Sequence, residues 1–158
     1  MFVLIVKVDV TVDLDDAAIR SIAVAWPNLR VFLLLEITTG DMPKVTLGGL
    51  IPLAAACPRL EQLTLQVNAT RVPNFAQTGN IIPANNLYRL NVCTSPVTDE
   101  SHDRLAIFIS FIFPSLPLLT WAGDERSQVL LSMGNQYIRC WRQVDRVLQP
   151  LLFAHPRP

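Results

Sequence analysis

The chain has 158 residues, which is enough for one domain with a substantial hydrophobic core. Its 13 basic and 13 acidic residues give a formal net charge of zero, and no basic stripe or polybasic segment stands out. This balance argues against nucleic acid and against anionic membrane surfaces as partners.

The first ten residues, MFVLIVKVDV, are apolar and rich in β-branched side chains, with Lys7 and Asp9 among them. They lack the basic start of a secretion signal, so their alternation predicts a β-strand. The longest apolar run, residues 105–119, is broken by Ser110, Pro114 and Pro117 and is shorter than the roughly 20 residues that cross a bilayer. We therefore expect no membrane-spanning segment.

One pattern recurs along the chain, and its clearest copy, LEQLTLQVN, starts at Leu60. Looser copies start at four further positions, which are Met1, Leu29, Leu87 and Leu116, at intervals of 27 to 31 residues. The spacing matches the leucine-rich repeat, whose short strands point their leucines into the core of a solenoid. We therefore predict an α/β solenoid with parallel strands on its concave face and helices on its convex face.

Helices are predicted between the strands. Acidic residues precede a helix over residues 17–25, Thr46 caps a helix over 47–56, and a third helix runs over about 99–112. Residues 71–85 are rich in proline, asparagine and glycine, and they predict a loop where the pattern would place another helix.

Each of the three helices is followed by an apolar residue and a proline. The apolar residues are Trp26, Cys57 and Phe113. Proline ends a helix and favours an extended residue before it, so the chain turns there into the next strand. We expect the apolar side chain at each turn to fill the core, and Cys57 to act as a small buried hydrophobe.

The pattern changes after Trp121. Apolar residues at helical spacing from Asp124 to Phe153 predict one helix or two that meet near Gly134. A repeat array needs a cap over its last unit, and Trp141 is expected to be buried in that cap. The predicted organisation is about five repeats over residues 1–123, the first incomplete, and a C-terminal helical cap and tail over 124–158.

The repeats resemble a known family. Residues 13–35, 45–69, 87–99 and 108–121 resemble the leucine-rich-repeat region of fungal F-box proteins, most specifically in VTLGGLIPLAAACPRLEQL and NVCTSPV. The resemblance implies a ribonuclease-inhibitor-like fold and the role of a substrate receptor in an SCF-type ubiquitin ligase. In such receptors an F-box docks on the Skp1 adaptor and the repeats hold the substrate. Because Met1 already lies on a predicted strand, we expect Skp1 as a partner only if an F-box lies upstream.

If the consensus leucines point into the core, the residues between them lie on the concave face. Read across the strands, they form three rows. The first row is Val3, Val31, Gln62, Arg89 and Leu118. The second row is Ile5, Leu33, Thr64, Asn91 and Thr120. The third row is Lys7, Leu35, Gln66, Cys93 and Ala122.

The concave face is predicted to be apolar over its first two strands and polar over the next two. Large exposed apolar areas mark interaction sites, so we expect a partner protein to bind here. The expected binding residues are Val31, Leu33, Leu35, Gln62, Thr64, Gln66, Arg89 and Asn91. The alternative is that a tail or a further segment covers the apolar strands.

No constellation of residues predicts catalysis. Asp13, Asp15 and Asp16 are interpreted as a helix cap rather than a metal site, because carboxylates favour the positive end of a helix. His102 lies at a helix start and His155 in the tail, without the orienting groups that nucleophilic catalysis needs. We expect no enzyme, no metal and no cofactor.

The three cysteines, Cys57, Cys93 and Cys140, are odd in number and widely spaced. They predict neither a disulfide framework nor a zinc site, and they suit an intracellular compartment, cytoplasmic or nuclear. The expected function is protein–protein recognition, as the substrate-binding region of an F-box-type receptor. The alternative is a stand-alone leucine-rich-repeat protein, or a fragment, without a role in ubiquitin transfer.

Overall fold

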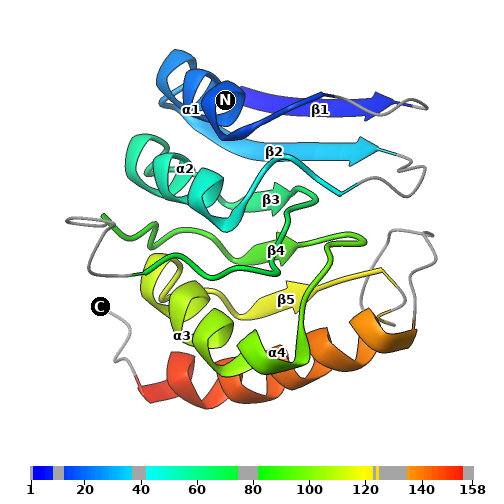
Figure 1. Cartoon of the computed structure of the whole chain (residues 1–158). Helices are drawn as coiled ribbons and strands as arrows, with labels where there is room; N and C mark the ends of the chain where they lie inside the picture. Colours follow the sequence, from blue (N-terminus) through cyan, green and yellow to red (C-terminus); the bar gives the residue numbers. More distant parts are fainter. Residues whose placement is uncertain are drawn as a thin grey trace.

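The computed structural model describes residues 2–8, 13–36, 42–74, 82–122, 124 and 135–154. Five parallel strands form one sheet in the order β1-β2-β3-β4-β5, so strands that follow one another in the chain lie side by side (Figure 1). The strands are β1 (Phe2–Val8), β2 (Leu29–Glu36), β3 (Gln62–Thr64), β4 (Arg89–Asn91) and β5 (Leu118–Thr120). The α/β class predicted from the sequence is confirmed.

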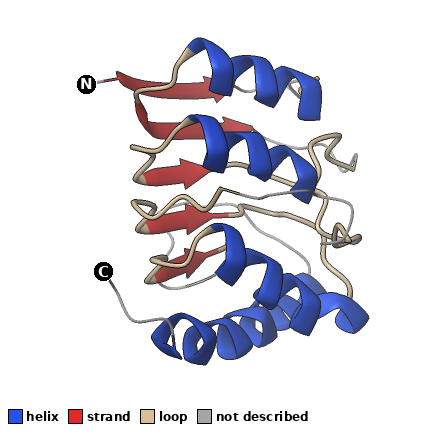
Figure 2. Ribbon diagram, turned by 90° about the vertical axis from the view of Figure 1, so that its left-hand side faces the viewer, coloured by secondary structure: helices blue, strands red, loops and turns tan. Residues whose placement is uncertain are grey.

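Three helices lie on one face of this sheet, and the fourth lies beyond β5 (Figure 2). The helices are α1 (Asp16–Ala25), α2 (Leu50–Ala56), α3 (His102–Ile112) and α4 (Asn135–Ala154). A 3-10 turn leads into two of them, η1 (Leu47–Gly49) before α2 and η3 (Asp99–Ser101) before α3. The three helices predicted between strands are confirmed, and the meeting point predicted near Gly134 lies outside the described residues.

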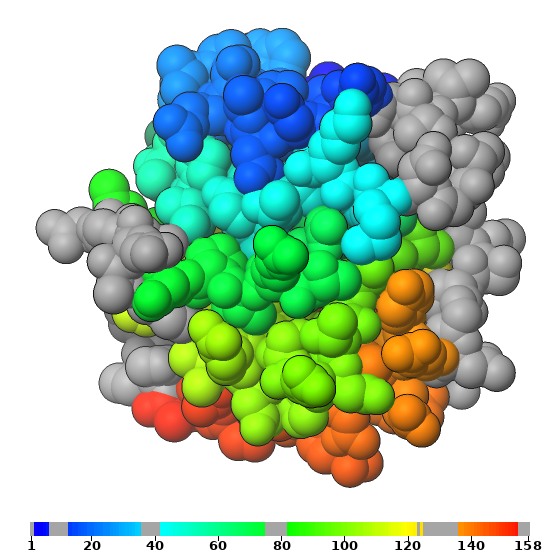
Figure 3. All heavy atoms as spheres, in the orientation of Figure 1, coloured from blue at the N-terminus to red at the C-terminus, as the bar shows by residue number. Residues whose placement is uncertain are grey.

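Segments that follow one another in the sequence lie next to one another in the molecule. Figure 3 shows the molecule in the same orientation as Figure 1, and its colours form bands that follow the sequence from one end of the molecule to the other. In residues 65–74 and 82–88, the structure has isolated bridges but no helix. None of the described helices is long and apolar enough to cross a membrane.

The acidic residues at the start of α1 cap this helix and hold it to the segment before α2. The Asp15 side chain caps α1 by accepting a hydrogen bond from the Ala18 amide at 2.8 Å. The Asp16 carboxylate accepts from the Thr46 amide at 2.7 Å and from its hydroxyl at 2.6 Å. Asp13 forms an ion pair with Lys44 at 2.6 Å. The helix cap interpreted from the sequence is thus confirmed for Asp15, whereas Asp13 and Asp16 contact the segment before α2.

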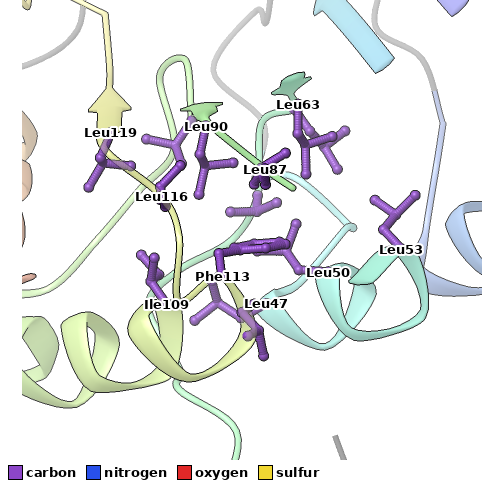
Figure 4. Close-up of a cluster of buried hydrophobic side chains, with 14 of the residues drawn as sticks. Leu47, Leu50, Leu53, Leu63, Leu87, Leu90, Ile109, Phe113, Leu116 and Leu119 are labelled. Carbon is purple, nitrogen blue, oxygen red and sulfur yellow. The ribbon is translucent and has the colours of Figure 1, made fainter. Parts of the chain in front are cut away.

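The core lies between the sheet and the helices. Figure 4 shows leucines of the strand segments pointing toward leucines of η1 and α2 and toward Ile109 and Phe113 of the α3 segment. The leucines drawn there are Leu63, Leu90 and Leu119 of β3, β4 and β5, and Leu87 and Leu116, which precede β4 and β5. All of them are at most 1% exposed, so the consensus positions face inward as the sequence predicts.

The residues that end the helices differ in burial. Cys57 and Phe113 are fully buried, as predicted. The same prediction for Trp26 is wrong, because this side chain is 40% exposed. Cys57 packs beneath the end of α1, with its sulfur 3.5 Å from the Trp26 carbonyl oxygen. Trp26 follows α1, the first helix among the described residues, and no earlier described helix encloses its indole ring.

The two ends of the sheet are covered unequally. At the β5 end, α4 packs against α3 and buries four side chains, which are Cys140, Trp141, Val144 and Leu148. The Trp141 indole donates a hydrogen bond to the main-chain oxygen of Ser95 at 2.8 Å. At the β1 end, four inward-facing side chains are only partly buried, and they are Leu4, Val6, Leu14 and Ile22. The predicted burial of Trp141 is confirmed.

Candidate functional site

The candidate site is the strand face, the side of the sheet turned away from α1, α2 and α3. The strand register brings the first two predicted rows together residue for residue. Row one is Val3, Val31, Gln62, Arg89 and Leu118. Row two is Ile5, Leu33, Thr64, Asn91 and Thr120. Of the third row, the register pairs Lys7 with Leu35 and extends no further, because β3 ends at Thr64.

Exposure falls steeply along row two. Ile5 is 57% exposed and Leu33 is half-buried, whereas Thr64 and Asn91 are 6% and 5% exposed. Gln66, just beyond β3, is 7% exposed. These three polar side chains were expected on an accessible surface, since polar residues are mostly exposed in proteins. In the structure they are buried, so they are not reachable by a partner.

The reachable part of the face is apolar over β1 and β2. Val3 and Ile5 are exposed, and Val31, Leu33 and Leu35 are half-buried. These five residues are called the apolar patch. Side chains alternate between the two faces of a strand. In β1 and β2 both the inward and the outward positions carry apolar residues, so the strand face is apolar there as well. β1 is also the edge of the sheet, so this patch adjoins a strand whose outer side has no partner strand among the described residues.

A polar strip lies beside the patch, at the start of β2, β3 and β4. Glu61 accepts a hydrogen bond from the Arg30 Nε atom at 2.8 Å and forms an ion pair with the same guanidinium. The Gln62 amide donates to the Tyr88 hydroxyl, and the Tyr88 ring is exposed. Together with Arg89, these residues are called the polar strip. Tyrosine and arginine are enriched among residues that dominate protein–protein binding energies.

The sequence reasoning missed Arg30, Glu61 and Tyr88. Each of them directly follows the first leucine of a repeat copy, a position that the predicted rows leave out. The signal was present in the sequence, because the residues at this position in successive copies include an arginine, a glutamate and a tyrosine. The Arg30–Glu61 pair forms because parallel strands place equivalent positions about 5 Å apart.

The turn after β4 is structural rather than part of the binding surface. The Cys93 amide donates to Asn91 Oδ1 at 2.8 Å, and Cys93 has a left-handed backbone with φ of 53°. The Ser95 hydroxyl accepts from the Val67 amide at 2.8 Å and donates to the Val92 carbonyl. Asn91, predicted as a binding residue, therefore uses its carboxamide oxygen to hold this turn.

The remaining candidate groups are held in structural contacts. The Cys140 thiol donates to Asp99 at 2.9 Å, and burial, followed by the nearby carboxylate, raises its pKa to about 11. Burial raises the pKa of the Cys57 thiol as well. Both thiols thus stay protonated near neutral pH, which makes them poor nucleophiles. The His102 ring lies 3.3 Å from Asp103. Within the described part of the chain, no group of three potential metal ligands comes together.

The arrangement suits non-covalent recognition, with an apolar patch flanked by a polar strip. Comparison with protein-family models gives no match, and no curated protein or solved structure matches the chain significantly. The fold assigns the chain to a broad class of proteins: an α/β protein whose sheet has five parallel strands and whose first three helices lie on one face of that sheet.

Proposed function

We propose that this protein is a recognition scaffold that binds another protein on its strand face. In its specific form, the proposal is that the chain is a leucine-rich-repeat solenoid and the substrate-binding region of an F-box-type SCF ubiquitin ligase receptor. The recognition role is supported by the contacts described above. The ligase role is supported by the resemblance of residues 13–35, 45–69, 87–99 and 108–121 to the repeats of fungal F-box proteins.

The single observation that carries the recognition role is the apolar patch. Soluble proteins rarely leave contiguous apolar surface uncovered unless it serves an interaction. Here Ile5 and Val3 stand exposed beside half-buried Val31, Leu33 and Leu35. The polar strip next to it supplies the polar rim that interfaces commonly have around an apolar centre.

The test is a comparison of the proteins captured by three forms of the chain. Leu33→Asp places a charge in the centre of the patch, and its matched control, Val24→Asp, places one on the exposed outer side of α1. Each immobilised form is exposed to a cell extract, and the captured proteins are quantified. We expect a partner that the Leu33 variant loses and the Val24 variant keeps.

Two results contradict the recognition role. One is a set of captured proteins that all three forms bind equally, which would mean that the patch is not the contact. The other is unfolding of the Leu33→Asp variant, seen by circular dichroism, which would place Leu33 in the core. The milder Leu33→Ser variant at the same position then serves as a second check, because it removes the apolar contact without adding charge.

The ligase role has a separate test. If the gene encodes an F-box upstream of Met1 in the same reading frame, Skp1 should co-purify with the longer product. Skp1 should not co-purify with residues 1–158 alone, and direct binding to them would mean that the docking surface lies within the repeats. Absence of an encoded F-box would remove the ligase role and leave the recognition role standing.

A further inference from the structure

Among the described side chains of the strand face, Arg89 is a cation without an ion-pair partner. It lies in row one on β4, between Gln62 of β3 and Leu118 of β5, and it is half-buried. Its Nε atom is buried and has no hydrogen-bond partner among the described residues. A guanidinium carries five donors, and an unsatisfied buried donor is costly. Nε itself is closed to solvent, so an acceptor from outside the chain can meet only the exposed part of this half-buried guanidinium.

The neighbouring acidic group does not neutralise Arg89. Glu61 is engaged by Arg30, through an Nε–Oε1 hydrogen bond of 2.8 Å and an ion pair with the same guanidinium. The Gln62 amide is turned to the Tyr88 hydroxyl. The ion pairs between described residues therefore leave one positive charge on this part of the face.

We infer that the partner segment carries a carboxylate that pairs with Arg89, at a fixed distance from the apolar side chains it places on the patch. This inference rests on the proposed recognition role and adds the chemistry of the partner. An arginine and a carboxylate form paired, charge-assisted hydrogen bonds, which are among the stronger polar contacts in proteins. Gln62 is the cross-strand neighbour of Arg89, so its side chain lies beside the pair.

The sheet sets the distance between the two contacts. Parallel strands lie about 4.8 Å apart, so Arg89 on β4 lies about 10 Å across the sheet from Val31 and Leu33 on β2. An α-helix rises about 1.5 Å per residue, so two turns, or about seven residues, cover that distance on one helix face. An extended segment has same-face side chains about 7 Å and about 13 Å apart, which fits the β2–β4 separation less well. The partner is thus an amphipathic helix laid across the strands, with its acidic residue about seven positions from an apolar anchor.

The test uses randomised peptides displayed on phage, about 15 residues long, selected on the immobilised full chain. We expect the selected peptides to share an apolar residue and an aspartate or glutamate about seven positions away. Arg89→Gln should weaken their binding by about tenfold or more, as loss of a charged hydrogen bond does. Arg59→Gln, at an exposed arginine of the turn after α2, is the matched control and should leave binding unchanged.

Two further variants of Arg89 test whether its positive charge is what selects the acidic peptides. Arg89→Lys keeps the charge and should keep the preference for acidic peptides, with weaker binding because lysine lacks the planar fork. Arg89→Glu should bind a selected peptide in which the acidic residue is replaced by lysine. Thermal unfolding of each variant shows whether it is folded.

The outcomes separate this inference from the proposed function. Peptides that need Leu33 but carry no acidic residue, and that bind Arg89→Gln normally, overturn the inference and leave the recognition role intact. Selection of no peptides, or of peptides that bind Leu33→Asp as well as the unchanged chain, overturns both. Peptides with the expected spacing that lose binding only in the Leu33 and Arg89 variants support both.

Discussion

Ser95 ties three parts of the molecule together, and replacing it by alanine gives a sharp test of the fold. The side chain is fully buried in the turn after β4. Its hydroxyl accepts from the Val67 amide at 2.8 Å and donates to the Val92 carbonyl, while its own carbonyl accepts from Trp141 of α4. Ser95→Ala keeps the last contact and removes the first two.

The expected cost follows from these contacts. Val67 is buried, so its amide is left without a partner, at about 1–3 kcal/mol, and loss of the second hydrogen bond adds about 0.5–1.5 kcal/mol. We therefore expect the free energy of unfolding to fall by about 2–4 kcal/mol, a large part of the 5–15 kcal/mol typical of a domain. Urea titration followed by circular dichroism should show a lower midpoint with an unchanged slope.

The matched control is Ser21→Ala, on the exposed side of α1. The Ser21 hydroxyl donates to the Ala17 carbonyl at 3.0 Å, a local bond whose loss the better helix propensity of alanine offsets. Its effect should stay within about 0.5 kcal/mol. In native-state hydrogen exchange, the Val67 amide should exchange faster in Ser95→Ala only. Equal, small effects of the two substitutions would refute the role given to the Ser95 hydroxyl.

Three further predictions concern the end covered by α4 and the turn before α2. Trp141→Phe keeps the buried ring but loses the indole hydrogen bond, so urea titration should show about 1–2 kcal/mol lower stability; unchanged stability would mean that this bond contributes nothing. Because the pKa of Cys140 is raised from 9.0 to about 11 in the folded state, folding favours the neutral thiol. Stability should therefore fall as pH rises from 9 to about 11, and Cys140→Ser should flatten that part of the profile; an unflattened profile would assign the loss to other groups. A Cβ on Gly49 would lie 2.7 Å from a carboxylate oxygen of Asp16, whereas the closest contact at Gly48 is 3.2 Å. Gly49→Ala should therefore lower the melting temperature clearly more than Gly48→Ala, and the reverse order would contradict this geometry.

The strand register was readable from the sequence because one short pattern repeats. Once the leucines of the copy at Leu60 are assigned to the core, every equivalent position in another copy follows, since side chains alternate along a strand. The helices were readable from capping residues such as Thr46 and from the prolines that end them. Both signals are local, and in this sheet each described strand pairs with its neighbours in sequence.

The burial of individual side chains could not be predicted from the repeated pattern. Thr64, Gln66 and Asn91 look like surface residues by type, yet they are buried. Trp26 looks like a core residue and is 40% exposed, because its unit lies at the end of the sheet. The Arg30–Glu61 pair depends on two copies placed side by side. These features depend on what lies above or beside a residue, which a repeating pattern does not encode.

The unequal covering of the two ends has a consequence for how the molecule opens. Each strand pairs only with its sequence neighbours, so β1 can separate from β2 while β3, β4 and β5 remain paired. Local opening of this kind has a lower free energy than global unfolding where few buried contacts resist it. Part of the apolar patch lies on β1, so a partner that binds there also holds the strand in place. Affinity for that partner and protection of the β1 amides from exchange should then rise and fall together, as two measures of one equilibrium.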